Sequence, residues 1–107
     1  MAQIPDITRE KVLEFYHKVK EFYPVKKVLL YGSHAKGRAT ADSDIDVAVV
    51  VDMPDHLKRI EITANLFHFA ADIDAAIEPK CIFWDEYRNY EQASILSEII
   101  TTGIEIA

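Results

Sequence analysis

One stretch of this 107-residue chain constrains its fold more than any other: an apolar run, rich in β-branched residues, that begins with two aspartates. The run spans residues 44–51, Asp-Ile-Asp-Val-Ala-Val-Val-Val, and is followed by Asp52. β-Branched residues favour strands, so the run predicts a strand. Because side chains alternate along a strand, Asp44 and Asp46 point to one face, and Ile45 and the valines that share its parity point into the core.

Helical and strand patterns alternate through the rest of the chain, which predicts a small α/β (α+β) protein. The expected elements are a helix at 8–23, a strand at 25–31, a helix from 55 to about 70, a strand at 73–77, a helix at 94–102 and a short strand at 104–106. Two alternatives stay open for residues 81–84, a short edge strand or a buried loop. A helical turn is expected to begin at Asp85.

The first two helices carry apolar residues at helical spacing, and we expect these stripes to face the core. In the first helix the stripe is formed by Val12, Phe15, Val19 and Phe22. In the second it is formed by Leu57, Ile60, Ala64 and Phe67. Thr8 and Asp55 are placed to cap these helices, and Gly103 suits a left-handed cap after the last helix.

Size and composition indicate one globular domain over residues 1–107. The formal net charge of −6 argues against nucleic acid or an anionic membrane as a partner. No apolar run approaches the roughly 20 residues that span a bilayer, and the N-terminus lacks the pattern of a secretory signal, so a cytoplasmic protein is expected. Cys81 is the only cysteine, which excludes an internal disulfide and a thiol cluster for zinc.

The Gly32–Ser33 pair forms a candidate phosphate site, because it follows a predicted buried strand and opens a small, polar stretch. Glycine allows close approach to the backbone, whose free N–H groups can bind phosphate oxygens, and the serine hydroxyl adds a donor. Lys36 and Arg38 follow and could add positive charge. The alternative for both is a solvated loop charge, and their spacing does not separate the two.

Carboxylates form the second part of the candidate site. Asp44 and Asp46 would repel each other, which raises the pKa of one of them unless a cation neutralises the pair, and hard oxygen ligands suit magnesium or manganese. Asp74 interrupts the apolar strand predicted at 73–77 and completes a three-carboxylate site if that strand neighbours the first. Asp72 has the same parity and competes for this position. Asp74 is favoured because Asp72 lies at a loop boundary.

Two other motifs fail at specific residues. Gly32 and Gly37 have the spacing of the two P-loop glycines, but Arg38-Ala39 stands where Lys-Ser or Lys-Thr is required. Alternating aspartates from Asp42 resemble an EF-hand calcium loop, yet Val47 occupies the position of its required glycine.

Taken together, Gly32-Ser33, ten intervening residues, Asp44-x-Asp46 and the later Asp74 resemble the minimal nucleotidyltransferases of the DNA polymerase β superfamily. The resemblance extends over nearly the whole chain. It implies a polymerase β-like fold with a mixed β-sheet flanked by helices. It also implies two Mg²⁺ ions, with Mn²⁺ as an alternative, and a nucleoside triphosphate such as ATP as substrate.

Residue by residue, the resemblance implies that Gly32 and Ser33 hold the distal phosphates and that Asp44 and Asp46 bind both metal ions. Asp74 would bind the metal ion nearer the acceptor and accept the proton of the attacking hydroxyl, so all three aspartates are catalytic and metal-binding candidates. Lys36 and Arg38 would complete the nucleotide site. Lys36 stands where the family more often has arginine, which keeps the charge but loses bidentate phosphate geometry.

Many proteins of this kind are encoded beside a HEPN-domain toxin, and some transfer AMP to that partner, so a HEPN partner and an antitoxin role are expected. Two alternatives remain: transfer to a small molecule, as in aminoglycoside-modifying relatives, where a homodimer could supply the missing acceptor pocket, or a non-catalytic binding subunit. His34 is expected to be a surface histidine. The aromatic segment 84–90 is either a partner-binding patch or core filling.

Overall fold

The computed structural model describes residues 5–37, 39–40, 43–90 and 94–107. The elements follow one another as α1 (Asp6–Lys20), β1 (Val25–Tyr31), β2 (Ile45–Val51), the 3-10 turn η1 (His56–Lys58), α2 (Arg59–Ala71), β3 (Ile77–Phe83), α3 (Trp84–Arg88), α4 (Ile95–Thr102) and β4 (Ile104–Glu105). Within the described ranges, no helix combines the length and the apolar character needed to cross a membrane.

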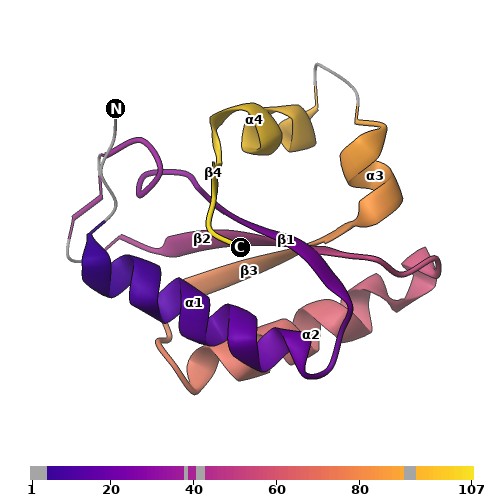
Figure 1. Cartoon of the computed structure of the whole chain (residues 1–107), viewed down its shortest axis with the longest axis horizontal. Helices are drawn as coiled ribbons and strands as arrows, with labels where there is room; N and C mark the ends of the chain where they lie inside the picture. The colour runs from indigo at the N-terminus through magenta and orange to yellow at the C-terminus, as the bar shows by residue number, and fades with distance from the viewer. Residues whose placement is uncertain (1–4, 38, 41–42, 91–93) are drawn as a thin grey trace.

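The four strands form one mixed sheet in the order β3-β2-β1-β4 (Figure 1). β1 pairs antiparallel with both β2 and β4, and β2 pairs parallel with β3. A parallel pair needs a crossover connection, and α2 supplies it. The expected mixed sheet flanked by helices is therefore confirmed.

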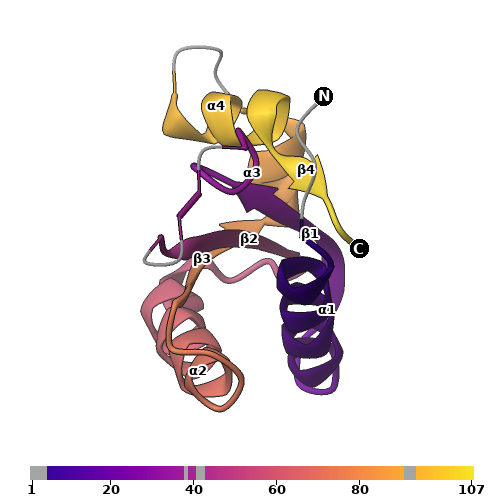
Figure 2. The ribbon, with the colours of Figure 1, turned by 90° about the vertical axis from the view of Figure 1, so that its left-hand side faces the viewer.

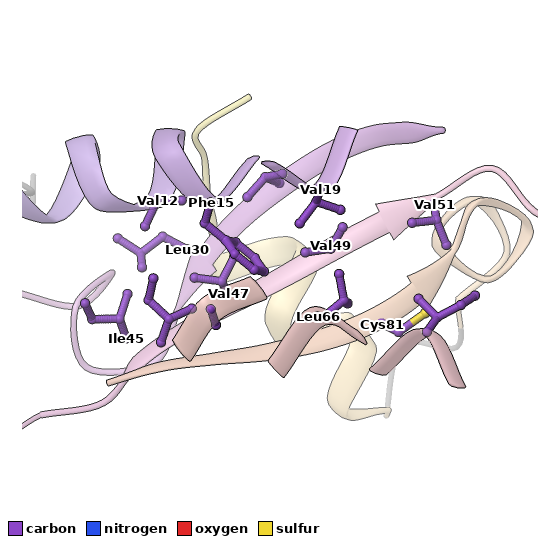
Figure 3. Packing of buried hydrophobic residues seen from close by; sticks show 14 of the residues in the cluster. Val12, Phe15, Val19, Leu30, Ile45, Val47, Val49, Val51, Leu66 and Cys81 are labelled. Atoms are coloured by element: carbon purple, nitrogen blue, oxygen red, sulfur yellow. The ribbon is translucent and has the colours of Figure 1, made fainter. Parts of the chain in front are cut away.

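Helices cover both faces of this sheet. α1 and α2 lie side by side under one face, and α3 and α4 lie over the other (Figure 2). The larger core lies between the sheet and the first two helices, where Val12, Phe15, Val19 and Leu66 meet the inward residues of β2 (Figure 3). A smaller core on the opposite face is formed by Leu29, Ala48, Val50, Ile82 and Ile99. β2 is buried on both faces, which explains why its sequence is an unbroken apolar run.

α1 confirms the first predicted helix, with shifted ends. It begins at Asp6, directly after Pro5, so Thr8 lies inside the helix and is buried instead of capping it. Val12, Phe15 and Val19 face the core as expected. Phe22 does not, because the helix ends at Lys20; its side chain is 58% exposed and stacks on Phe69.

α2 lies where a helix was predicted, but the predicted buried stripe was wrong. Asp55 does cap the start, accepting a 3.0 Å hydrogen bond from the backbone N–H of Leu57. The stripe is nevertheless exposed: 94% for Leu57, 84% for Ile60 and 47% for Phe67, with Ala64 exposed as well. The buried face consists of Ile62, Leu66 and Ala70. Since both sides of α2 carry apolar residues at helical spacing, periodicity alone could not choose between them.

β3 begins at Ile77, so the strand predicted at 73–77 was placed too early. Residues 72–76 instead form a turn, in which the N–H of Asp74 bonds to the carbonyl of Ala70 at 2.9 Å. The sequence favoured a strand that ends before Pro79, because proline cannot donate a ladder hydrogen bond, but Pro79 lies inside β3. A proline fits here because β3 is at the sheet edge, where one side of the strand needs no ladder partner. Of the alternatives for residues 81–84, the edge strand is confirmed up to Phe83, and α3 begins at Trp84.

The C-terminal helix and strand are confirmed, but the left-handed cap at Gly103 is wrong. Gly103 has a φ of −70°, which other residues can adopt. The glycine is required for space: a Cβ there would lie 2.4 Å from the carbonyl oxygen of Ile99. The close turn returns the chain to β1, where Ile104 pairs with Leu30.

The two faces of α2 should respond differently to truncation. We expect Leu66→Ala to lower the free energy of unfolding by about 2–5 kcal/mol, because it leaves a cavity in the core. Ile60→Ala should change this free energy by less than about 0.5 kcal/mol, because its side chain is mostly in solvent. Urea unfolding followed by circular dichroism measures both. A larger loss for Ile60→Ala than for Leu66→Ala would show that α2 packs through the other face.

Candidate functional site

Three strands bring polar side chains together at one end of the sheet. In the strand register Tyr31 of β1 lies opposite Asp46 of β2, and Asp46 lies opposite Glu78 of β3. Asp46 shares its parity with Ala48 and Val50, so this row lies on the sheet face that α4 covers. Asp44 precedes Asp46 by two residues, at the sheet end where β2 begins.

The three carboxylates interact electrostatically. Burial raises the pKa of Asp46, and the negative charge of Asp44 raises it further. The pKa of Glu78 is raised chiefly by the charge of Asp44, with burial and the charge of Asp46 adding to it. The charges of Asp44 and Asp46 thus both act on Glu78, and the three carboxylates form one acidic cluster.

The chemistry of this set fits a hard divalent cation, although its side chains are not yet arranged as a finished coordination shell. Carboxylate oxygens are the ligands that magnesium and manganese prefer, and a cation would relieve the repulsion that raises the two pKa values. Throughout the described ranges, no three His, Cys, Asp or Glu side chains are already positioned to hold a metal ion. What the three carboxylates share is proximity and charge.

Gly32 positions the loop after β1 against this acidic set. Its φ is +73°, a conformation that favours glycine, and a Cβ would lie 2.4 Å from Oδ2 of Asp46. A side chain at position 32 would therefore displace the carboxylate. The chain then turns tightly, with the Lys36 N–H bonded to the Gly32 carbonyl at 3.2 Å and Ser33 half-exposed. Gly32, at the start of the predicted phosphate turn, therefore lies directly against the carboxylate of Asp46.

Lys36 links this loop to α4. Its ammonium group lies 3.4 Å from Oε1 of Glu98, and both side chains are exposed. An exposed ion pair of this kind contributes little free energy, so Lys36 can exchange Glu98 for another anion at small cost. Arg38, the other predicted cationic residue of the nucleotide site, lies outside the described residues.

Asp74 lies outside the acidic row, because it belongs to the turn before β3. Its Oδ2 accepts a 2.5 Å hydrogen bond from Lys11 of α1, and its Oδ1 accepts the Ala76 N–H at 2.8 Å. These bonds, the lysine first, hold the pKa of Asp74 below its usual value. The structure joins Asp44 and Asp46 to Glu78, and Asp74 ties α1 to the turn. Asp72, its competitor, is exposed at the end of α2.

Glu78 was missed because a proline normally ends a strand, and Pro79 directly follows it. A signal was available: Glu78 interrupts the apolar residues around it, and the alternation Ile77, Pro79, Cys81, Phe83 marks the opposite, core-facing parity. An edge strand that tolerates proline would have placed Glu78 on the same face as Asp46.

Tyr31 and His34 also lie near Asp46. From the sequence, Tyr31 had no assigned role and His34 was expected on the surface. Burial, with the charges of Asp46 and Glu78, raises the pKa of Tyr31 to about 12, so its hydroxyl stays neutral beside them. His34, expected on the surface, is only 9% exposed. Within the part of the chain that the structure describes, neither of its ring nitrogens has a hydrogen-bond partner. The interaction of Asp46 with His34 lowers the pKa of Asp46 and so opposes the effects of burial and of the Asp44 charge.

Comparison with known proteins agrees with this geometry. The family model for the nucleotidyltransferase domain matches residues 12–101. The protein named "Putative protein adenylyltransferase MJ0604", from Methanocaldococcus jannaschii, is 32% identical over 91 residues, and the match covers 78% of this chain and 91% of that protein.

Solved structures show the same fold at lower identity. A crystal structure of a toxin–antitoxin with AMP-PNP has a TM-score of 0.55 and 21% identity, over 92% of this chain and 72% of that one. A tri-AMPylated HEPN toxin of Shewanella oneidensis in complex with MNT antitoxin gives a TM-score of 0.52 and 18% identity, over 95% and 71% of the two chains.

The structural role of Asp74 predicts a pH-dependent effect of Asp74→Asn. The folded-state pKa is lowered, so the ion pair stabilises the protein above the unfolded-state pKa and loses its effect as the pH falls through the folded-state value. Because both partners are partly exposed, we expect a loss of about 0.5–1 kcal/mol at pH 7. Urea unfolding should show this difference shrinking below about pH 4.

Asp72→Asn is the matched control, because Asp72 is exposed at a helix C-terminus. Its free energy of unfolding should equal or slightly exceed that of the wild type at pH 7. Equal stability of the wild type and Asp74→Asn at every pH would contradict the role of the Lys11 ion pair.

Proposed function

The chain belongs to the nucleotidyltransferase domain family, and from that premise we propose that it transfers AMP from ATP, with divalent metal, to a hydroxyl of a HEPN-class partner protein. The single observation that carries the proposal is the meeting of Asp44, Asp46 and Glu78 beside the Gly32 turn. A polyphosphate needs both an anion-binding backbone and a cation held by carboxylates, and this end of the sheet offers the residues for both.

In this proposal Asp44, Asp46 and Glu78 would hold the metal ions, with Glu78 in the position for which Asp74 was predicted. Bound divalent cations supply the positive charge that stabilises the attacking and leaving oxygens. Gly32 and Ser33 would bind the distal phosphates. Lys36 would leave Glu98 to approach the triphosphate, and Arg38 keeps its predicted role as a second cation there.

The reaction itself is a displacement at the α-phosphorus. The acceptor oxygen forms a bond to phosphorus, the bond to the pyrophosphate oxygen breaks, and pyrophosphate leaves. The hydroxyl proton passes to a carboxylate, and Glu78 is suited to receive it because its raised pKa favours proton binding. Tyr31 stays neutral and adds no further negative charge to the place where the triphosphate would bind.

The acceptor and the nucleotide base are proposed from the similar proteins. The relative from Methanocaldococcus jannaschii is named as a protein adenylyltransferase, and one of the similar structures is a toxin–antitoxin with AMP-PNP. The Shewanella oneidensis complex pairs an AMPylated HEPN toxin with its MNT antitoxin. By analogy this chain acts as the antitoxin and modifies its toxin.

Transfer is tested by incubating the protein with α-labelled ATP, magnesium and the proposed HEPN-domain partner protein. Label should appear covalently on the partner, and EDTA should prevent it. Asp44→Asn and Glu78→Gln should each lower the initial rate roughly 100-fold or more, because each removes a negative ligand at the site of charge development. Asp74→Asn, the matched carboxylate variant, should stay within about tenfold of the wild type.

Two outcomes would contradict this assignment. Loss of transfer in Asp74→Asn with full activity in Glu78→Gln would return the third-carboxylate role to Asp74. A wild type that neutralises the toxin without labelling it, and does so equally well as Asp44→Asn, would identify a non-catalytic binding subunit.

Carboxylate repulsion also predicts how metal-free protein responds to Glu78→Gln. Removing one of three like charges should raise the melting temperature in EDTA by roughly 1–6 °C, because like charges on neighbouring strands destabilise a sheet. In excess Mg²⁺ and a non-hydrolysable ATP analogue the order should reverse, because only the wild type gains the full stabilisation of ligand binding. Differential scanning fluorimetry measures both states. A lower melting temperature for the variant in EDTA would show that Glu78 is not under repulsion.

A further inference from the structure

The outer side of α2 is the most exposed apolar surface among the described residues. Leu57 of the preceding turn η1 and Ile60, Ala64 and Phe67 of α2 form a row that we call the α2 stripe, and Leu57 and Ile60 are 94% and 84% exposed. Single exposed apolar residues are common on proteins, but a row along one helix face marks an interaction site. α2 lies beside α1 under the sheet (Figure 2), and its buried residues, Ile62, Leu66 and Ala70, lie on a different side of the helix from the exposed stripe.

One end of this stripe, at Phe67, lies beside a groove that Glu78 also lines. A groove of about 330 Å³ lies between α2 and the edge strand β3, and Phe67 forms part of its wall. Glu78 lines the same groove, together with Tyr31 and Lys80. Phe67 therefore belongs both to the exposed stripe and to the groove that Glu78 lines.

Arg59 fixes the distance between the stripe and Glu78. Its Nη1 donates a 2.8 Å hydrogen bond to the carbonyl of Cys81 in β3, and its Nη2 lies 2.5 Å from Oε2 of Glu86. The guanidinium also lies over the ring of Phe83, 4.7 Å from its centroid. These contacts hold α2 against β3, so a partner bound to the helix has a fixed position relative to Glu78.

We propose that the acceptor protein docks an amphipathic helix on the α2 stripe and thereby places its acceptor hydroxyl in the groove at Glu78. This assignment rests on the proposed function. From Ile60 to Phe67 α2 rises by roughly 10 Å, and Leu57 lies in the turn before it, so the partner helix needs about two to three turns with apolar residues at i, i+3, i+4 and i+7. Lys80 also lines this groove, so we expect the partner to carry an acidic residue near its acceptor hydroxyl that pairs with this lysine.

Ile60→Glu tests the docking surface, and Ile7→Glu is its matched control. Both isoleucines are exposed, Ile60 at 84% on α2 and Ile7 at 59% on α1, so neither change removes a core side chain. The measured reactions are AMP transfer to the HEPN-domain protein and transfer to a high concentration of N-acetyl-L-tyrosinamide, a small hydroxyl acceptor that cannot use the stripe. Isothermal titration calorimetry without ATP measures binding of the HEPN-domain protein.

Ile60→Glu should raise the KM for the protein acceptor by about tenfold or more, because it buries a charge at the centre of the contact. Its kcat, and its transfer to the small acceptor, should stay within twofold of the wild type. Binding measured by calorimetry should weaken by the same factor as KM rises. Ile7→Glu should match the wild type in all three measurements.

Several results would overturn the docking surface: equal effects of the two variants, unchanged partner binding in Ile60→Glu, or no binding of the HEPN-domain protein by the wild type. A wild-type homodimer that Ile60→Glu dissociates, with KM unchanged, would assign the stripe to a second copy of this chain. If the wild type binds the partner through Ile60 yet transfers no label, the proposed function fails and the docking surface stands. If transfer is full and binding does not depend on Ile60, the docking surface fails and the proposed function stands.

Discussion

The site depends on an unfavourable interaction that the sheet enforces between Asp44, Asp46 and Glu78. Burial raises the pKa of Asp46 and the charge of Asp44 adds to it, while the charges of both aspartates raise the pKa of Glu78. Separation would relieve the repulsion, but the strands cannot move apart because β2 is buried on both faces. A slip of β3 by one residue would turn Glu78 to the core and Pro79 to the acidic row, exchanging the two faces of the strand. The register of the apolar residues therefore fixes the register of the charges.

The same constraint explains the residues around the acidic set. Gly32 is required because Asp46 occupies the space of its Cβ, and Tyr31 retains its proton because burial and neighbouring negative charge both disfavour its ionised form. Lys36 is held by a weak, exposed contact to Glu98 instead of by the aspartates. Among the described residues, no ion pair neutralises Asp44, Asp46 or Glu78, so a cation bound there would remove a repulsion that the folded protein otherwise carries.

The sequence predicted most of this arrangement, and the failures have identifiable causes. Local patterns were sufficient for β1, β2, the existence of all three longer helices and the placement of Gly32 near the two aspartates of β2. Local patterns were insufficient where the structure depends on the position of an element in the fold, such as whether a strand lies at the sheet edge or which side of a helix is buried. Pro79 ends a central strand but not an edge strand, and this difference placed Glu78 in β3 opposite Asp46, where the sequence had led us to expect Asp74. A helix with apolar residues on two sides has no locally defined inner face, which is why the α2 stripe was assigned to the core.

The exposure of the α2 stripe, which the sequence had assigned to the core, bears on function as well as on fold. A helix buried on one side only needs no apolar residues on its other side for stability, so the exposed stripe of α2 has a cost in solubility that the fold alone does not explain. Ile62, Leu66 and Ala70 already supply the contact with the core. Because Phe67 also lines the groove that holds Glu78, whatever covers the stripe lies next to the carboxylates. In the proposed reaction a protein acceptor bound to the stripe would therefore lie beside the residues proposed to hold nucleotide and metal.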